Sequence, residues 1–215
     1  MRKQIFLLQL AIFTTLLFAV SGCARPTQPP LPKGNVSVGV AYFSQPRTSA
    51  EMLAGFIGEE VPVVDEEVFA ELDVIFRQTL RNKSDKHFVP ADKAFDCSQK
   101  IIRGSNEYRA ALRRWAAVGR CMNVDALVVP QVYEWRQREG SGAGVVRPAR
   151  IVLAFFTIDT RSETLIARSH FEETQQALTD NLLNTRQFFK RGARWVTAEE
   201  LSVEAMERAI KELGL

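Results

Sequence analysis

The sequence predicts an α+β fold in which a single mixed β-sheet carries helices packed on it. Val36–Phe43 alternates apolar and polar residues, which is typical of a strand. Arg150–Ile158 is apolar at both odd and even positions, as expected of a central strand covered on both faces. Apolar residues recur at helical spacing near residues 65–80 and 201–213, which indicates amphipathic helices. The predicted order is strand, helix, strand, helix, three strands, helix.

The first half of the domain contains two predicted helices and two predicted strands. Asp65 is placed to cap a helix in which apolar residues recur at helical spacing on one face. That face consists of Val68, Leu72, Ile75, Phe76 and Leu80. Phe88–Pro90 predicts a short second strand, and a second helix is expected from about Asn106 to Gly119. The segment Asp92–Ser105 has mixed polarity and receives no assignment.

The second half predicts three successive strands and a final helix. The first strand, Ala126–Trp135, contains Pro130, which demands a bulge or an edge position because proline cannot donate a ladder hydrogen bond. Arg150–Ile158 is the second. In the third, every other residue is expected to face inward: Leu165, Ala167, Ser169 and Phe171. Thr197 and Glu200 form a capping box for the last helix. Its expected inward residues are Leu201, Ala205, Met206, Ala209, Ile210 and Leu213.

Residues 1–22 are predicted to be a signal peptide rather than part of the fold. Arg2 and Lys3 precede an apolar run that is too short for a stable membrane span. The ending Val20-Ser-Gly-Cys23 resembles the lipobox of bacterial lipoproteins. In that family the cysteine thiol is diacylated, with chains such as palmitate, and cleavage occurs just before the cysteine. We therefore expect Cys23 to be lipidated, the alternative being an ordinary cleaved signal with a chance cysteine.

The segment 23–35 is predicted to be a short tether, followed by one globular domain at 36–215. Four prolines and no apolar periodicity favour a semi-extended chain that reaches about 40 Å at most. Without the signal, 26 basic and 25 acidic residues remain, so the mature chain carries a net charge of +1. Nucleic acid is therefore not an expected partner.

The remaining cysteines, Cys97 and Cys121, are an even pair in an exported protein, which favours a disulfide over two free thiols. Two separate thiols stay open as the alternative. Neither His87 nor His170 has ligand-like spacing to these cysteines, so no metal site is expected.

Motifs that would carry catalysis or hold a cofactor were not found in the sequence. There is no Gly-x-Ser-x-Gly elbow, and the glycine-rich stretch Gly140–Gly144 joins two strands instead of opening a phosphate-binding helix. Paired carboxylates such as Glu172 and Glu173 could serve a hydrolase, but a solvated strand end is the favoured explanation for them. No catalytic residue and no cofactor are therefore predicted.

Two groups of arginine and aromatic residues are candidate partner surfaces. Arg109 and Arg113 lie one turn apart on the second predicted helix, where an ordinary solvated face is the alternative. The other group flanks the glycine-rich connection and consists of Tyr133, Trp135, Arg136 and Arg138. Aromatic residues and arginine dominate the energetics of protein interfaces, although strand-end packing would also explain this group.

The order of elements resembles the small α/β domain shared by the amino-terminal part of TolB and the outer-membrane lipoprotein activators of penicillin-binding proteins. CsgG-type secretion lipoproteins have a related core. The matching features are Val36–Phe43, the helix with Leu72 and Leu80, and Trp115–Gly119 followed by Val124–Val129. The resemblance implies an accessory role in the envelope, but the short tether and the absence of a propeller depart from these families. Ala24, in place of Asp, resembles the pattern of lipoproteins sorted to the outer membrane.

Together these features predict a non-enzymatic lipoprotein anchored to the periplasmic face of the outer membrane through Cys23. Its expected work is to bind an envelope protein, for example in peptidoglycan synthase activation. The alternatives are a subunit of a CsgG-like export assembly and, less favoured, a wall-acting hydrolase.

Overall fold

The computed structural model describes residues 36–54, 62–104, 110–142, 144–175, 189 and 191–215. The predicted signal peptide, the lipidation site Cys23 and the tether lie outside the described residues. Within the described ranges, none of the helices combines the length and the apolarity needed to cross a membrane.

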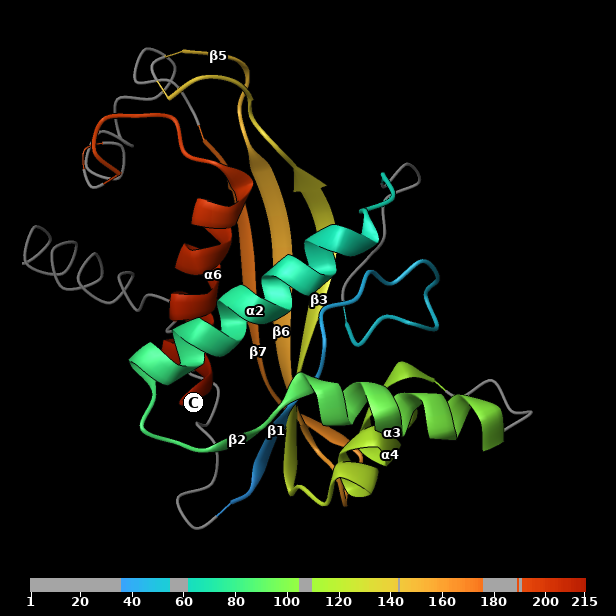
Figure 1. The fold of residues 1–215 in the computed structure, drawn as a ribbon. Helices are drawn as coiled ribbons and strands as arrows, with labels where there is room; N and C mark the ends of the chain where they lie inside the picture. The colour runs from blue at the N-terminus through green and yellow to red at the C-terminus, as the bar shows by residue number, and fades with distance from the viewer. Residues whose placement is uncertain (1–35, 55–61, 105–109, 143, 176–188, 190) are drawn as a thin grey trace, which may run out of the picture.

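A five-stranded mixed sheet forms the centre of the molecule, with strand order β2-β1-β3-β6-β7 (Figure 1). Its strands are β1 (Val38–Val40), β2 (Phe88–Val89), β3 (Ala126–Arg136), β6 (Arg150–Asp159) and β7 (Thr164–Thr174). The short strands β4 (Glu139–Gly140) and β5 (Val145–Arg147) form a separate hairpin. The helices are α2 (Glu66–Lys83), α3 (Ala91–Gly104), α4 (Ala111–Met122) and α6 (Ala198–Leu213). The predicted α+β class and its main mixed sheet are confirmed.

The sheet separates two apolar layers. β1 is parallel to both β2 and β3, whereas β3, β6 and β7 are antiparallel to one another. On one face α2 and α6 pack over Val128, Leu153 and Phe155. The alternate residues Leu127 and Val129 face the other side, where α3 and α4 cover them. This arrangement follows from the strand period of two, which sends neighbouring side chains to opposite faces.

Three phenylalanines join the larger layer at its centre. Phe43 follows β1, Phe76 comes from α2 and Phe155 from β6, and their ring centroids lie 5.3–5.9 Å apart. All three side chains are almost fully buried. Tilted and edge-to-face contacts at this distance are favourable beyond the area they bury. They fix α2 against the sheet and so position the residues discussed below.

The predictions for β6 and α6 are confirmed. β6 lies between β3 and β7 and is buried along most of its length. Thr197 accepts a hydrogen bond from the Glu200 amide, and the Glu200 side chain accepts one from the Thr197 amide, completing the capping box. All the expected inward residues of α6 are buried.

The prediction for β7 is wrong at one residue. Ala167, Ser169 and Phe171 are buried as expected, but Leu165 is 38% exposed. The register of β6 and β7 shifts between Thr157 and Ile158, so the alternation breaks there. An extra residue in one strand moves the side chains beyond it to the other face.

The segment left unassigned, Asp92–Ser105, forms most of the helix α3. Its buried residues Ala94, Cys97 and Ser98 follow helical spacing but are small, so the apolar stripe is weak in the sequence. The next helix, α4, was predicted too early. It runs from Ala111 to Met122 and ends at Asn123, which adopts the left-handed conformation with φ 59°.

Two local expectations need correction. Asp65 precedes α2, but its side chain makes no capping hydrogen bond; its backbone carbonyl accepts from the Val68 amide instead. Pro130 lies within β3, and the bulge falls two residues later, between Val132 and Glu134. On the β1 side, Val128 and Val132 bond to residues 41 and 44, so Pro130 faces the gap after β1 ends. No ladder donor is needed at that gap.

Candidate functional site

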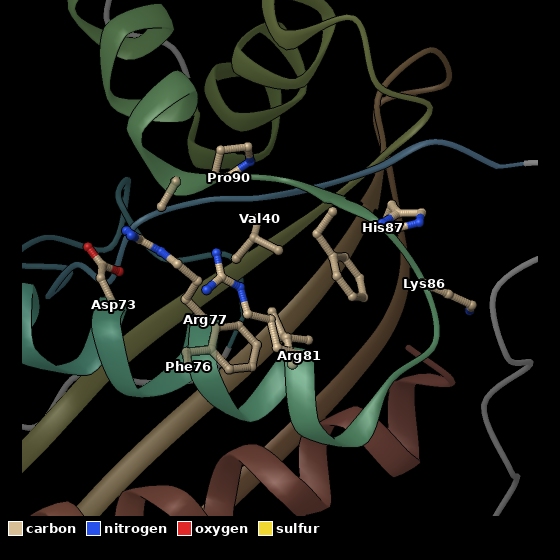
Figure 2. A pocket seen from close by; sticks show the side chains of 11 residues that line it. Val40, Asp73, Phe76, Arg77, Arg81, Lys86, His87 and Pro90 are labelled. Carbon is tan, nitrogen blue, oxygen red and sulfur yellow. The ribbon is translucent and has the colours of Figure 1, made fainter.

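A concavity lies between α2 and the edge strand β2 (Figure 2). Its volume is about 300 Å³. Residues from β1, α2, the α2–β2 connection, β2 and the start of α3 line it. We call it the edge pocket; it is lined by Val40, Asp73, Phe76, Arg77, Leu80, Arg81, Lys86, His87, Phe88, Pro90 and Ala91.

The topology of the sheet explains why a pocket forms at this position. After β1 the chain passes to α2 on one face, whereas after β2 it passes to α3 on the other. Val40 ends β1, and Pro90 and Ala91 follow β2 directly. In sheets with parallel strands, a crevice opens where neighbouring connections leave toward opposite faces, and ligands commonly bind there.

The edge pocket has an apolar floor and a mainly cationic rim. Val40, Phe76 and Leu80 are buried beneath it. On the rim lie Arg77, Arg81, Lys86 and His87, all exposed. Figure 2 shows the Arg77 and Arg81 side chains between α2 and the strand that leads to Pro90, with Lys86 and His87 at the end away from Asp73.

The rim residues differ in how they are held. A contact of 3.5 Å joins Arg77 to Asp92, whose side chain is 79% exposed. The Lys86 ammonium donates to the Gly214 carbonyl at the end of α6. For Arg81 and His87, no side-chain hydrogen bond or ion pair is found among the described residues. The pocket therefore presents unpaired donors at its rim.

Asp73 provides the acidic group of the edge pocket. Its carboxylate accepts the Phe43 backbone N–H at 2.9 Å. Burial raises the pKa of Asp73 to about 6, although the Phe43 hydrogen bond and the nearby Arg77 charge oppose this shift. The carboxyl group thus titrates close to neutral pH.

Tyr133 and Trp135, predicted as partner-surface residues, make contacts within the domain. The Tyr133 hydroxyl lies 2.9 Å from the Ala54 carbonyl and 3.0 Å from Gln131 Oε1. Burial raises the pKa of Tyr133 to about 12. Trp135 packs against the larger core layer.

Arg136 and Arg138 lie where β3 leads into the hairpin. Arg136 is half-buried, and its Nε atom has no hydrogen-bond partner among the described residues. The Arg138 guanidinium donates to the Trp195 carbonyl. Between them, Gln137 accepts the Ala198 N–H at 3.0 Å and donates to Glu199 at 2.7 Å. This strand end therefore holds the start of α6.

The predicted arginine face of the second helix is described only in part. Arg109 lies outside the described residues, and Arg113 is exposed on α4. Arg120, farther along, donates to the Thr160 carbonyl at 2.6 Å and pairs with Glu163 at 3.0 Å. The prediction for the pair Arg109 and Arg113 therefore stays a prediction, because only Arg113 is among the described residues.

Cys97 on α3 and Cys121 on α4 form a disulfide, with their Cα atoms 5.8 Å apart. The two helices are therefore joined covalently on the second face of the sheet. Across the described residues, no group of three His, Cys, Asp or Glu side chains is arranged to hold a metal ion.

The carboxylates Glu172 and Glu173 do not act as a pair. As neighbours on β7 they point to opposite faces of the sheet. Glu172 binds Arg150 at 2.8 Å, and Glu173 binds Arg191 at 3.1 Å. His170, on the same face as Glu172, is exposed and lies 3.9 Å from it.

A second hollow of about 190 Å³ lies beyond the end of β1, between α4 and β3. Tyr42, Ser98, Trp115 and Gln131 contribute to its lining. The Trp115 ring packs edge-on against Tyr42, and its Nε1 has no acceptor among the described residues.

Neither hollow was predicted from the sequence, because each combines residues from distant elements. For the edge pocket, the only local signal was the recurrence of Asp73, Arg77 and Arg81 at intervals of four on one helix.

The fold places the chain among α+β proteins built on a five-stranded mixed sheet flanked by helices. No family model matches it, and no curated protein matches its sequence. A PelC dodecamer from Paraburkholderia phytofirmans is similar in fold, with 13% identity over 86% of this chain and 93% of that one (TM-score 0.46). A lipoprotein from Neisseria meningitidis shares 12% identity over 74% and 99% (TM-score 0.38). The LpoB C-terminal domain from Salmonella enterica shares 10% over 65% and 83% (TM-score 0.36).

Proposed function

We propose that this chain is a lipid-anchored accessory protein of the cell envelope that binds a protein partner and catalyses no reaction. The observation that carries the proposal is the lipobox-like Val20–Cys23 followed by a short tether and one compact domain. An acylated cysteine anchors a domain to a membrane and requires no catalytic activity of that domain. The outer membrane, on its periplasmic side, is the proposed location.

The hairpin formed by β4 and β5 is the proposed docking element. Val146, on β5, is 89% exposed, and the ion pair between Glu139 and Arg147, at 3.0 Å, joins the two strands beside it. Protein interfaces combine an apolar core with a polar rim, and an exposed valine beside an ion pair offers both on a small scale. Its neighbours Tyr133, Trp135 and Arg138 contribute by holding the hairpin on the domain.

The position of the hairpin fits a protein anchored at its amino terminus. β1 pairs with the start of β3 at Ala126, whereas the hairpin follows the far end of β3 at Arg136. The 11 residues of β3 extend about 35 Å. Figure 1 shows the hairpin and β1 at opposite ends of the sheet. The described chain therefore begins at one end of the sheet, at Val36, while the hairpin projects from the other.

Photo-crosslinking in living cells tests this proposal. A crosslinking amino acid replaces Val146, and the matched control replaces Val74, which is 58% exposed on α2. We expect one dominant envelope protein to be captured from Val146 and not from Val74. The Cys23→Ala variant should lose this capture, because it lacks the anchor. Equal products from both valines, or none from Val146, would remove the hairpin as a docking element.

A further inference from the structure

The arginines of the edge pocket differ from other arginines of the domain in their ion pairing. Arg150 is held by Glu134 at 2.7 Å and Glu172 at 2.8 Å, and Arg191 is held by Glu204 at 2.8 Å. These side chains stabilise the fold through charge-assisted hydrogen bonds. Arg81 has no such carboxylate among the described residues, and Arg77 has only the long contact with Asp92. Asp73 lies in the same pocket and interacts electrostatically with Arg77, but among the described residues no carboxylate holds either guanidinium group at a short hydrogen-bond distance.

The floor of the pocket adds a second requirement for a ligand. Val40, Phe76 and Leu80 are buried beneath the rim, and Phe88 also lines the pocket. A simple inorganic anion would satisfy the arginines but leave this apolar surface uncovered. At about 300 Å³, the pocket is at the lower end of the range for small-molecule sites.

We infer that the edge pocket binds a small ligand in which a phosphate or carboxylate group is attached to an apolar body. The planar guanidinium forks of Arg77 and Arg81 match either oxyanion, and His87 and Lys86 extend the positive rim. The first turn of α3 begins at Ala91 beside the same pocket, and its dipole favours negative charge there. The apolar body covers the floor. This inference goes beyond the proposed function and does not depend on the hairpin.

The two histidines of the chain provide reporters for the test. His87 lies on the rim of the edge pocket, whereas His170 lies on the exposed face of β7. The full lipidated chain is placed in nanodiscs of phosphatidylcholine, and its imidazole signals are followed by NMR at constant pH and ionic strength. Phenylphosphate is the probe, with inorganic phosphate and phenol as its two halves.

We expect the His87 signals to move with phenylphosphate and to saturate, while those of His170 stay in place. Inorganic phosphate should bind at least about tenfold more weakly, because it leaves the apolar floor uncovered. Phenol, which has no oxyanion, should produce no saturable shift.

A pair of charge-matched variants locates the binding groups. Arg81→Gln should weaken phenylphosphate binding by about tenfold, since it removes a charge-assisted hydrogen bond. Arg208→Gln removes the same charge from an exposed pair with Glu212 on α6 and should leave binding unchanged. Both arginines are exposed, so neither change disturbs the core.

Three results would overturn the inference. In the first, His87 and His170 shift together without saturation. In the second, the Arg208 variant weakens binding as much as the Arg81 variant. The third uses nanodiscs containing phosphatidylglycerol: a His87 shift there, without any response to phenylphosphate, would assign the pocket to the membrane surface. None of these results bears on crosslinking from Val146, so the two proposals fail separately.

Discussion

Asp73 shows how one side chain can serve both the fold and a pocket. Its carboxylate accepts the amide of Phe43, the residue whose ring joins the central aromatic group. The same carboxylate borders the edge pocket one helical turn before Arg77. Burial raises its pKa to about 6 from the ordinary aspartate value of about 3.9, so the folded state binds this proton more tightly than the unfolded state does.

This difference predicts how Asp73 affects stability at different pH values. Because the folded pKa is the higher one, the free energy of unfolding falls as the pH rises from about 4 to about 6, and the loss persists above 6. Asp73→Asn keeps an acceptor for the Phe43 amide and removes the charge. We expect it to raise the free energy of unfolding by about 1 kcal/mol at pH 7, a value discounted for partial exposure, and to give no gain below pH 4.

Urea unfolding of the two proteins at a series of pH values measures this effect. Asp92→Asn, at an exposed carboxylate near the same arginine, is the control and should change the pH profile far less, because Asp92 has the smallest of the effects on the pKa of Asp73. A constant difference between Asp73→Asn and the parent protein at every pH would contradict the role assigned to burial.

At the scale of elements, α4 packs on the sheet through a glycine. A Cβ atom built on Gly119 would lie 2.3 Å from Cγ2 of Thr160. Thr160 is itself fixed, because its hydroxyl donates to the Val124 carbonyl at 2.6 Å. The close approach of helix and strand therefore depends on the missing side chain at Gly119.

Gly119→Ala tests this packing. Alanine favours a helix by about 1 kcal/mol, but the clash with Thr160 outweighs this gain. We expect a net loss of about 1–2 kcal/mol in the free energy of unfolding. Thr160→Ser keeps the hydroxyl and removes Cγ2, so the double variant should lose less than the two single variants together.

Gly144→Ala is the matched control, since its added Cβ would meet nothing within 4 Å. Strictly additive losses from Gly119→Ala and Thr160→Ser in thermal or urea unfolding would show that the two residues do not compete for space.

Elements with large, regularly spaced apolar residues could be predicted from the sequence, and those built on small residues could not. α6 shows clear helical spacing of leucine, methionine and isoleucine, and every residue predicted to face inward is buried, although the small residues Ala198 and Ser202 are buried without having been predicted. α3 buries Ala94, Cys97 and Ser98, whose small side chains give little periodic signal. Its disulfide to α4 supplies stabilisation that apolar burial does not, about 3 kcal/mol for a separation of 24 residues.

At the scale of the whole molecule, the pocket could not be predicted because three distant segments form it. Val40, Arg81 and Pro90 meet only after β1 and β2 pair and their connections leave for opposite faces. Sequence spacing reveals which residues share a helix face, but the order of strands in a sheet is decided by long-range pairing.

The proposed lipid anchor would determine where the whole molecule acts, and its sorting is the last prediction. The lipobox-like ending at Cys23 is followed by Ala24, and the resemblance to sorted lipoproteins implies transfer to the outer membrane. We expect the chain to fractionate with the outer membrane on a density gradient and to incorporate labelled palmitate. Ala24→Asp should remain palmitate-labelled but move to the inner membrane. Cys23→Ala should lose the label altogether, and a labelled Cys23→Ala product would contradict lipidation at this residue.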